Sequence, residues 1–156
     1  MSAANGTLIM RGLLACVQTR LPTYLDAVEA ALGVALTDPE EYILGRRDVH
    51  SSDRLPTVRF MVISGTPEMA AQAAWAFNPL TAEIILALKE STPEALNTSV
   101  NAHADALLNL IAAHRDLDGA CDQVEIENVD WWDGPPASGD IGGVVLVVNI
   151  YNEIRT

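Results

Sequence analysis

Apolar residues in the first part of the chain follow the spacing of a helix. They are separated by three or four positions and fall on one stripe: Met10, Leu14, Val17, Leu21, Leu25, Val28 and Leu32. This spacing predicts helical structure over residues 8–32. Pro22 lies inside the stretch and lacks a backbone donor, so the sequence predicts either a kink or two consecutive helices there. Gly33 is a natural position for the helix to end.

The periodic pattern fades between residues 34 and 56, which predicts turns and an exposed loop. The β-branched, apolar segment 57–64 then predicts a buried strand. Residues 65–79 fit either a helix or an irregular arm or hairpin strand, and both interpretations stay open. The candidate exposed-loop residues are Arg46, Arg47, Asp48, His50, Asp53 and Arg54.

A strand and a long helix are expected next. Over residues 81–91, apolar side chains alternate in the manner of a strand. Thr92 followed by Pro93 is typical of a helix start, with a cap residue and a proline at the first helical position. We therefore expect a helix from residue 93 to about 114. The residues expected on its buried face are Leu96, Val100, Ala104, Leu107 and Ile111.

Two further strands are expected at the end of the chain. In "QVEIENVDWW" the apolar alternation that begins at Val124 changes sides near Asn128, which predicts a β-bulge or a twist. The segment "GGVVLVVNIYNEI" is apolar on both faces until Asn149 and predicts a central strand. The order of elements predicts an α+β fold, with a mostly antiparallel sheet of about four strands packed against an N-terminal helical segment and one long central helix.

Composition narrows the class of protein. The 156 residues are 49% hydrophobic and 19% charged, which predicts a folded chain and a single domain over 1–156, with the sheet and long helix within 57–153. So low a charged fraction suggests apolar surface that self-association would bury. The formal net charge of -12 disfavours tight binding of nucleic acid. Neither a signal peptide nor a membrane span is recognised, so we expect a soluble, intracellular protein.

Few motifs for catalysis or metal binding are present. His50, His103 and His114 lack metal-ligand spacing, and surface or helix-end positions are expected for them. The segment "DLDGACD" begins like a calcium loop but lacks the required glycine, so we expect a solvated turn. Cys16 and Cys121 are expected to be buried in a reducing compartment. The sequence predicts no catalytic residue, no metal site, no cofactor and no enzymatic activity.

Trp131 and Trp132 are adjacent and precede a loop rich in proline, glycine and serine. Adjacent strand residues point to opposite faces, so both rings cannot enter the same core. One could lie in the core while the other shields the sheet edge, one could pack against a neighbouring subunit, or the pair could stack on carbohydrate. The residues of the candidate subunit or partner interface are Trp131, Trp132, Asp133, Pro135, Pro136 and Asp140.

The order of these elements and their residue patterns resemble those of the tail terminator proteins of long-tailed bacteriophages. The segments that carry the resemblance are "RLPTVRFMV", "TAEIILALKES", "PEALNTSVNAHADALLNLIAAH", "VEIENVDWW" and "GGVVLVVNIYNEI". They cover most of the chain from residue 54, and the helix before it matches loosely. The resemblance implies a hexameric ring that caps the head-proximal end of the tail tube and joins it to the head connector, without catalysis.

The resemblance also implies partners and a location. The partners would be other copies of the chain, the tail tube protein and the head–tail connector proteins, while DNA would pass through an acidic lumen without specific binding. The protein would belong to the virion tail or neck and would assemble in the host cytoplasm. The loop "DGPPASGDIGG" would be a contact arm, with Trp131 and Trp132 at the strand end that leads into it.

Other functions stay open. Within the virion, the chain could be another neck protein, such as a head-completion or connector adaptor protein, or a subunit related to the tail tube. A small cytosolic ligand-binding domain or enzyme is a different class. It would be expected to show a concave pocket with convergent polar groups.

Overall fold

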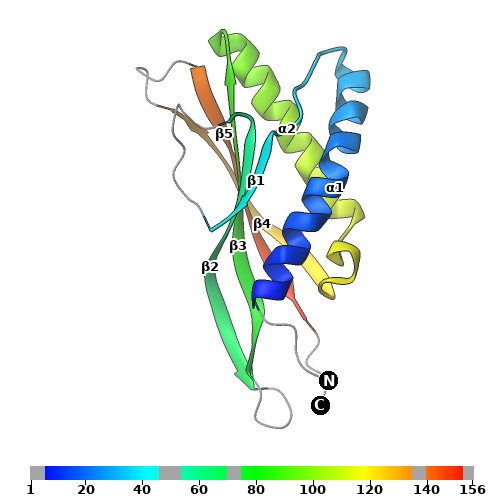
Figure 1. Cartoon of the computed structure of the whole chain (residues 1–156), viewed down its shortest axis with the longest axis vertical. Helices are drawn as coiled ribbons and strands as arrows, with labels where there is room; N and C mark the ends of the chain where they lie inside the picture. Colours follow the sequence, from blue (N-terminus) through cyan, green and yellow to red (C-terminus); the bar gives the residue numbers. More distant parts are fainter. Residues whose placement is uncertain (1–5, 46–53, 70–74, 135–139, 153–156) are drawn as a thin grey trace.

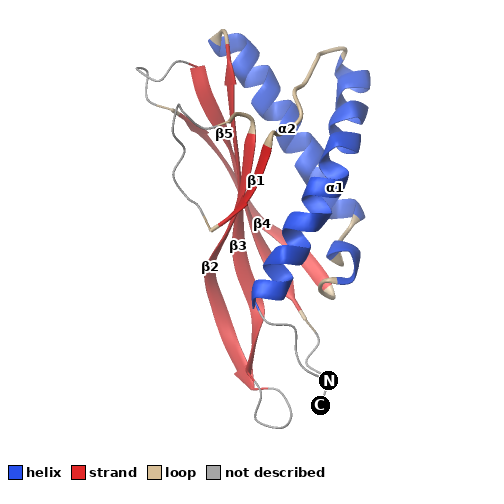
Figure 2. Cartoon of the chain, viewed as in Figure 1, coloured by secondary structure: helices blue, strands red, loops and turns tan. Residues whose placement is uncertain are grey.

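Two helices cover one face of a five-stranded sheet (Figure 1). The computed structural model describes residues 6–45, 54–69, 75–134 and 140–152. Both helices lie on the same side of the sheet (Figure 2), which confirms the predicted α+β class. Neither helix has the length and apolar character needed to cross a membrane. In chain order the elements are α1 (Gly6–Leu32), β1 (Glu41–Leu44), β2 (Thr57–Met69), β3 (Trp75–Glu90), α2 (Pro93–Ala113), the short 3₁₀ helix η2 (Leu117–Gly119), β4 (Gln123–Asp133) and β5 (Asp140–Tyr151).

The sheet has the strand order β1-β2-β3-β5-β4. The pairs β2–β3, β3–β5 and β4–β5 are antiparallel, and β1 pairs with β2 in parallel. The predicted count of about four strands missed β1, which lies in the region expected to contain only turns and loop. With four residues on the edge of the sheet, β1 is too short to show a period.

Helix α1 is one continuous helix that includes Pro22, so the expectation of two consecutive helices is wrong. Its apolar stripe packs against the sheet and against α2. Of the stripe predicted from spacing, Met10, Val17, Leu21, Leu25 and Val28 are buried and Leu14 is partly buried, whereas Leu32 at the helix end is 54% exposed. Gly33 follows with a φ of 68°, the left-handed conformation that ends many helices.

Helix α2 matches its prediction closely. The Thr92 hydroxyl oxygen accepts a hydrogen bond from the backbone N–H of Ala95 at 3.1 Å, and Pro93 occupies the first turn. All five residues expected on the inner face are buried. The helix lies over β3 and β5, the two central strands.

The predicted irregularity of β4 is a β-bulge. Its pairing with β5 shifts between Ile126 and Asn128. Val124 and Val129 pair with Ile150 and Leu146, and both face the helices. In a regular strand, residues five positions apart face opposite sides of the sheet, so the extra residue of the bulge is required. β5 lies between β3 and β4, as its two-sided apolar pattern predicted.

Beyond the helices, β2 and β3 continue as a two-stranded ribbon, which we call the arm (residues 62–69 and 75–79). Pairing extends to Met69 opposite Trp75. Figure 1 shows the arm reaching past the N-terminal end of α1, away from both helices. The hairpin interpretation of residues 65–79 is confirmed for its described part. The prediction of a buried strand over 57–64 is wrong from Val62 onward, because β2 there continues past the first turn of α1.

Candidate functional site

A groove of about 1000 Å³ lies between α2, the end of β4 and the start of β5. We call it the α2–β4 groove. It forms because α2 lies over β3 and β5 and leaves the last residues of β4 uncovered on the helix side of the sheet. Its walls include Pro93, Asn97 and Asn101 from the start of α2, Trp131 and Asp133 from β4, and Ile141 from β5.

The two tryptophans of β4 point to opposite faces of the sheet, as predicted. Trp131 pairs with Val144, whose side chain faces the helices, and Trp132 pairs with Gly143. Trp131 is 55% exposed and Trp132 is half-buried, so neither ring lies in the core. A large aromatic side chain exposed beside a groove is of the kind that anchors many protein interfaces.

Gly143 is required because the Trp132 ring packs over it on the face turned away from the helices. A Cβ at this position would lie 2.9 Å from Cε2 of Trp132 and would overlap the carbonyl oxygen of Leu86 on β3. The Trp132 indole N–H is buried and finds no acceptor within the described part of the chain. The close approach of three strands therefore fixes the groove floor.

Only part of the predicted interface can be placed. Trp131, Trp132 and Asp133 all line the α2–β4 groove. Asp140 begins β5 opposite Glu90. Pro135 and Pro136 lie outside the described residues.

The same limit applies to the predicted exposed loop. Arg46, Arg47, Asp48, His50 and Asp53 lie outside the described residues. Arg54 is described and exposed, and its Nε lies 3.9 Å from a carboxylate oxygen of Glu40 and 3.8 Å from one of Glu41. These two acids lie at the start of β1. Arg54 therefore contacts β1 from the residues that lead into β2, the strand with which β1 pairs in parallel.

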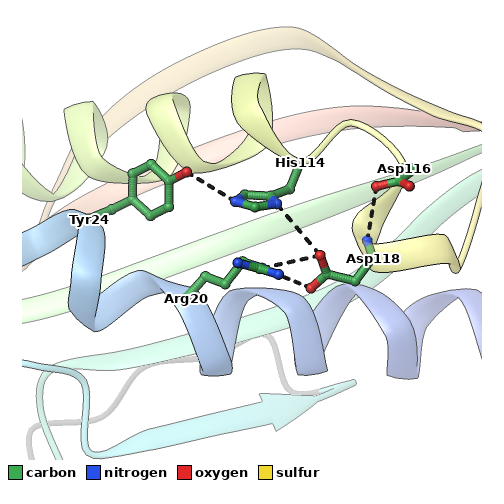
Figure 3. A network of polar contacts seen from close by, with 5 residues as sticks. All are labelled: Arg20, Tyr24, His114, Asp116 and Asp118. Atoms are coloured by element: carbon green, nitrogen blue, oxygen red, sulfur yellow. Dashed lines mark hydrogen bonds and ion pairs between the residues drawn. The ribbon is translucent and has the colours of Figure 1, made fainter.

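A second cluster of polar groups lies where α1 meets the end of α2 (Figure 3). The Arg20 Nε–H donates to both carboxylate oxygens of Asp118, at 2.9 and 3.2 Å. His114 Nδ1 lies 3.5 Å from Asp118, and its Nε2 lies 3.0 Å from the Tyr24 hydroxyl. No local pattern in the sequence indicated this cluster, because Arg20 and Asp118 are 98 positions apart.

The Asp118 backbone is in the left-handed conformation, with φ 58° and ψ 35°, and its N–H donates to the Asp116 carboxylate at 3.2 Å. This turn aims the Asp118 carboxylate at α1. The hydrogen bond from Arg20 lowers the pKa of Asp118 and raises that of Arg20. Both nitrogens of His114 have partners inside the cluster, which therefore ties α1 to the end of α2.

His103 and the two thiols also serve packing. His103 is 1% exposed, so the expectation of a surface position is wrong. It lies on the inner face of α2, with its ring nitrogens 2.7 Å from the Ser99 carbonyl oxygen and 3.1 Å from that of Thr37. Cys16 and Cys121 are buried as predicted, and burial raises the pKa of each thiol to about 12.

Neither metal-ligating groups in the described part of the chain nor similarity to known proteins indicates a function. Within the described ranges, no group of three or more His, Cys, Asp or Glu residues is placed to hold a metal ion. No protein-family model matches the chain, and no curated protein sequence matches it. The α2–β4 groove and the exposed arm are the two surface features considered for a function.

Proposed function

We propose that the chain is a structural virion protein, a tail terminator whose copies form a hexameric ring. The ring would cap the tail tube and join it to the head connector in the neck of a long-tailed bacteriophage. Its partners are further copies of the chain, the tail tube protein and the connector proteins. The role requires no catalytic group and no cofactor.

The observation that carries the proposal is the exposed apolar surface of the arm. Val62, Ile63, Met69 and Phe77 are 43%, 41%, 58% and 45% exposed. An isolated two-stranded ribbon is marginally stable in water, and exposed apolar groups on such a ribbon are typical of a contact with another chain. This supports a protein that functions as an assembly of several copies.

The charge on the open face of the sheet also supports the proposal. Glu83, Glu125 and Asp130 pair with Val147, Asn149 and Val145 of β5, so all three carboxylates share the face turned away from the helices. Among the described residues, two bases share this face, the exposed Lys89 and the fully buried Arg59, so these three acids outnumber them. A face with this charge repels DNA phosphates. If it lines the ring lumen, DNA would slide past without adhering.

Native mass spectrometry of the purified protein, with negative-stain imaging of the same sample and of mixtures with tail tubes, tests the proposal. We expect hexameric rings, or single rings on one end of tail tubes that then stop growing. Long cylinders made of this chain alone would indicate a tail-tube subunit instead. A stable monomer that leaves tubes unchanged would contradict the virion role and favour a ligand-binding domain.

An assay of tail tube growth distinguishes a terminator from the other neck proteins. A terminator stops the polymerisation of tail tube protein at substoichiometric amounts, because each ring blocks one tube end. A head-completion or connector adaptor protein would form a ring or bind the connector without changing tube length. Tube length measured by imaging, with and without the protein, distinguishes the two.

A further inference from the structure

The arm and the α2–β4 groove lie at opposite ends of the same strand. Phe77 belongs to the arm end of β3, and Lys89 pairs with Ile141 in the groove wall at the other end. Twelve residues of extended strand span about 40 Å. The arm of one copy therefore cannot reach the groove of that same copy.

The base of the arm is held in position. The Asn78 side-chain amide donates to the Glu68 carboxylate at 3.3 Å, across the two strands. The Asn78 side-chain oxygen accepts a hydrogen bond from the backbone N–H of Asn152 at 3.2 Å. The Phe77 ring lies against Gly65, where a Cβ would come within 2.8 Å of the ring. These contacts fix the direction of the arm relative to the sheet.

The arm also has the charge that a contact between copies requires. Two chains of net charge -12 repel each other, so a stable contact has to use a part of the surface that carries few acids. Glu68 is the single ionisable side chain among the described residues of the arm, and its carboxylate is hydrogen-bonded to Asn78. The Trp131 ring in the groove is likewise apolar and exposed.

We propose that the arm of one copy docks in the α2–β4 groove of the next copy, with Met69 and Phe77 packed against Trp131. The groove volume of about 1000 Å³ has room for several side chains. Such a contact joins two different surfaces, so it repeats by rotation and closes a ring or extends a filament. The inference rests on the proposed ring and specifies how its copies are joined.

Substitutions in the arm and in the groove test the contact. Phe77→Ser and Trp131→Ala should each raise the protein concentration needed for assembly at least tenfold, as measured by native mass spectrometry across a dilution series. Leu32→Ser is the matched control, because Leu32 is equally exposed, at 54%, but belongs to neither surface. Thermal unfolding of each variant at low concentration verifies that the fold is retained. Assembly of both variants at the concentration of the parent protein would overturn the inference.

Cross-linking identifies which surfaces meet. Thr66→Cys in the arm and Asn101→Cys in the groove place one exposed thiol on each variant. The native thiols are buried, with a pKa of about 12, so they do not compete at neutral pH. We expect a short bis-maleimide to link the two variants when they are mixed, and not to link either variant to itself.

The outcomes separate this inference from the proposed function. Rings that form without the mixed cross-link, or with Thr66→Cys linked to itself, would overturn the arm-to-groove contact and leave the ring intact. A mixed cross-link on protein that fails to stop tube growth would support the contact and contradict the terminator role. A monomer at every concentration, with no cross-link, would contradict both.

Discussion

The two halves of β2 both contain large apolar residues but have opposite surroundings. In the body of the sheet, Val58 and Phe60 are fully buried beneath the helices, and β1 pairs with the outer edge of the strand. A few residues later, Val62 and Ile63 are as apolar but more than 40% exposed, because the helices and β1 have ended. An apolar strand pattern therefore predicts that other residues cover the strand. It does not specify whether those residues belong to the same chain.

Truncating a phenylalanine in the body of the sheet should destabilise the fold far more than truncating one on the arm. Phe60→Ala should lower the free energy of unfolding by about 3–5 kcal/mol, since it leaves a cavity in the core. Phe77→Ala, on the arm, should change it by less than about 0.5 kcal/mol in the monomer. Urea unfolding at low protein concentration measures both. Equal losses would show that the arm is part of the folded body of the monomer.

A loss of stability of intermediate size is expected at Gly143, in the groove floor. Gly143→Ala should cost about 2–3 kcal/mol, because the added methyl group overlaps the Leu86 carbonyl oxygen and the Trp132 ring. Gly6→Ala is the control, since the nearest atom to its Cβ is a Leu80 methyl carbon at 3.9 Å. Chemical denaturation compares the two variants. A Gly143→Ala protein as stable as the control would mean that the groove floor can shift.

A smaller effect is expected at the N-terminus of α2, one residue before the groove begins at Pro93. Thr92→Ala removes the side-chain cap of α2 and should lower the free energy of unfolding by about 1 kcal/mol. The matched substitution is Thr98→Ala, one turn into the helix, where the hydroxyl donates to the Glu94 carbonyl oxygen on an exposed face. Thermal unfolding should show a lower Tm for the first variant alone.

The smallest effect is expected from the polar cluster, far from both surfaces. The pKa of Asp118 is lowered in the folded state by its hydrogen bond with Arg20, so the carboxylate stabilises the fold above its unfolded pKa of about 4. That contribution is lost as the pH falls through the lower, folded-state pKa. The difference in Tm between the parent protein and Asp118→Asn should therefore be present at pH 7 and shrink at pH 3. Asp105→Asn, at an exposed position on α2, provides the comparison and should show a smaller difference at pH 7.

Local signals predicted much of the fold. The Thr92-Pro93 pair located the start of α2, and the change of alternation near Asn128 located the bulge in β4. The short strand β1 was missed because its pairing with β2 depends on a neighbour rather than on its own pattern. Pro22 was tolerated within α1, where the helix packs against α2 and the sheet.

The sites were harder to predict because they join distant segments. Trp131 was recognised as an interface candidate from its size and its place before a loop. Its neighbours in the groove, Asn97 and Asn101, looked like ordinary solvent-facing residues of a helix. Likewise, the left-handed turn at Asp118 and its contact with Arg20 depend on how α1 packs against η2, for which no local pattern exists.

The fixed base of the arm bears on how many copies an assembly contains. Asn78 anchors the arm to the end of β5, so the angle between the arm and the groove is a property of the single subunit. If the two surfaces join successive copies, that angle sets the rotation from one subunit to the next. A ring closes when this rotation is a whole fraction of a turn, and any other value gives a helix. The symmetry of the assembly would then depend on the twist of the two arm strands. Removing two residues of β3 at the base of the arm would change the number of subunits rather than the strength of their contact.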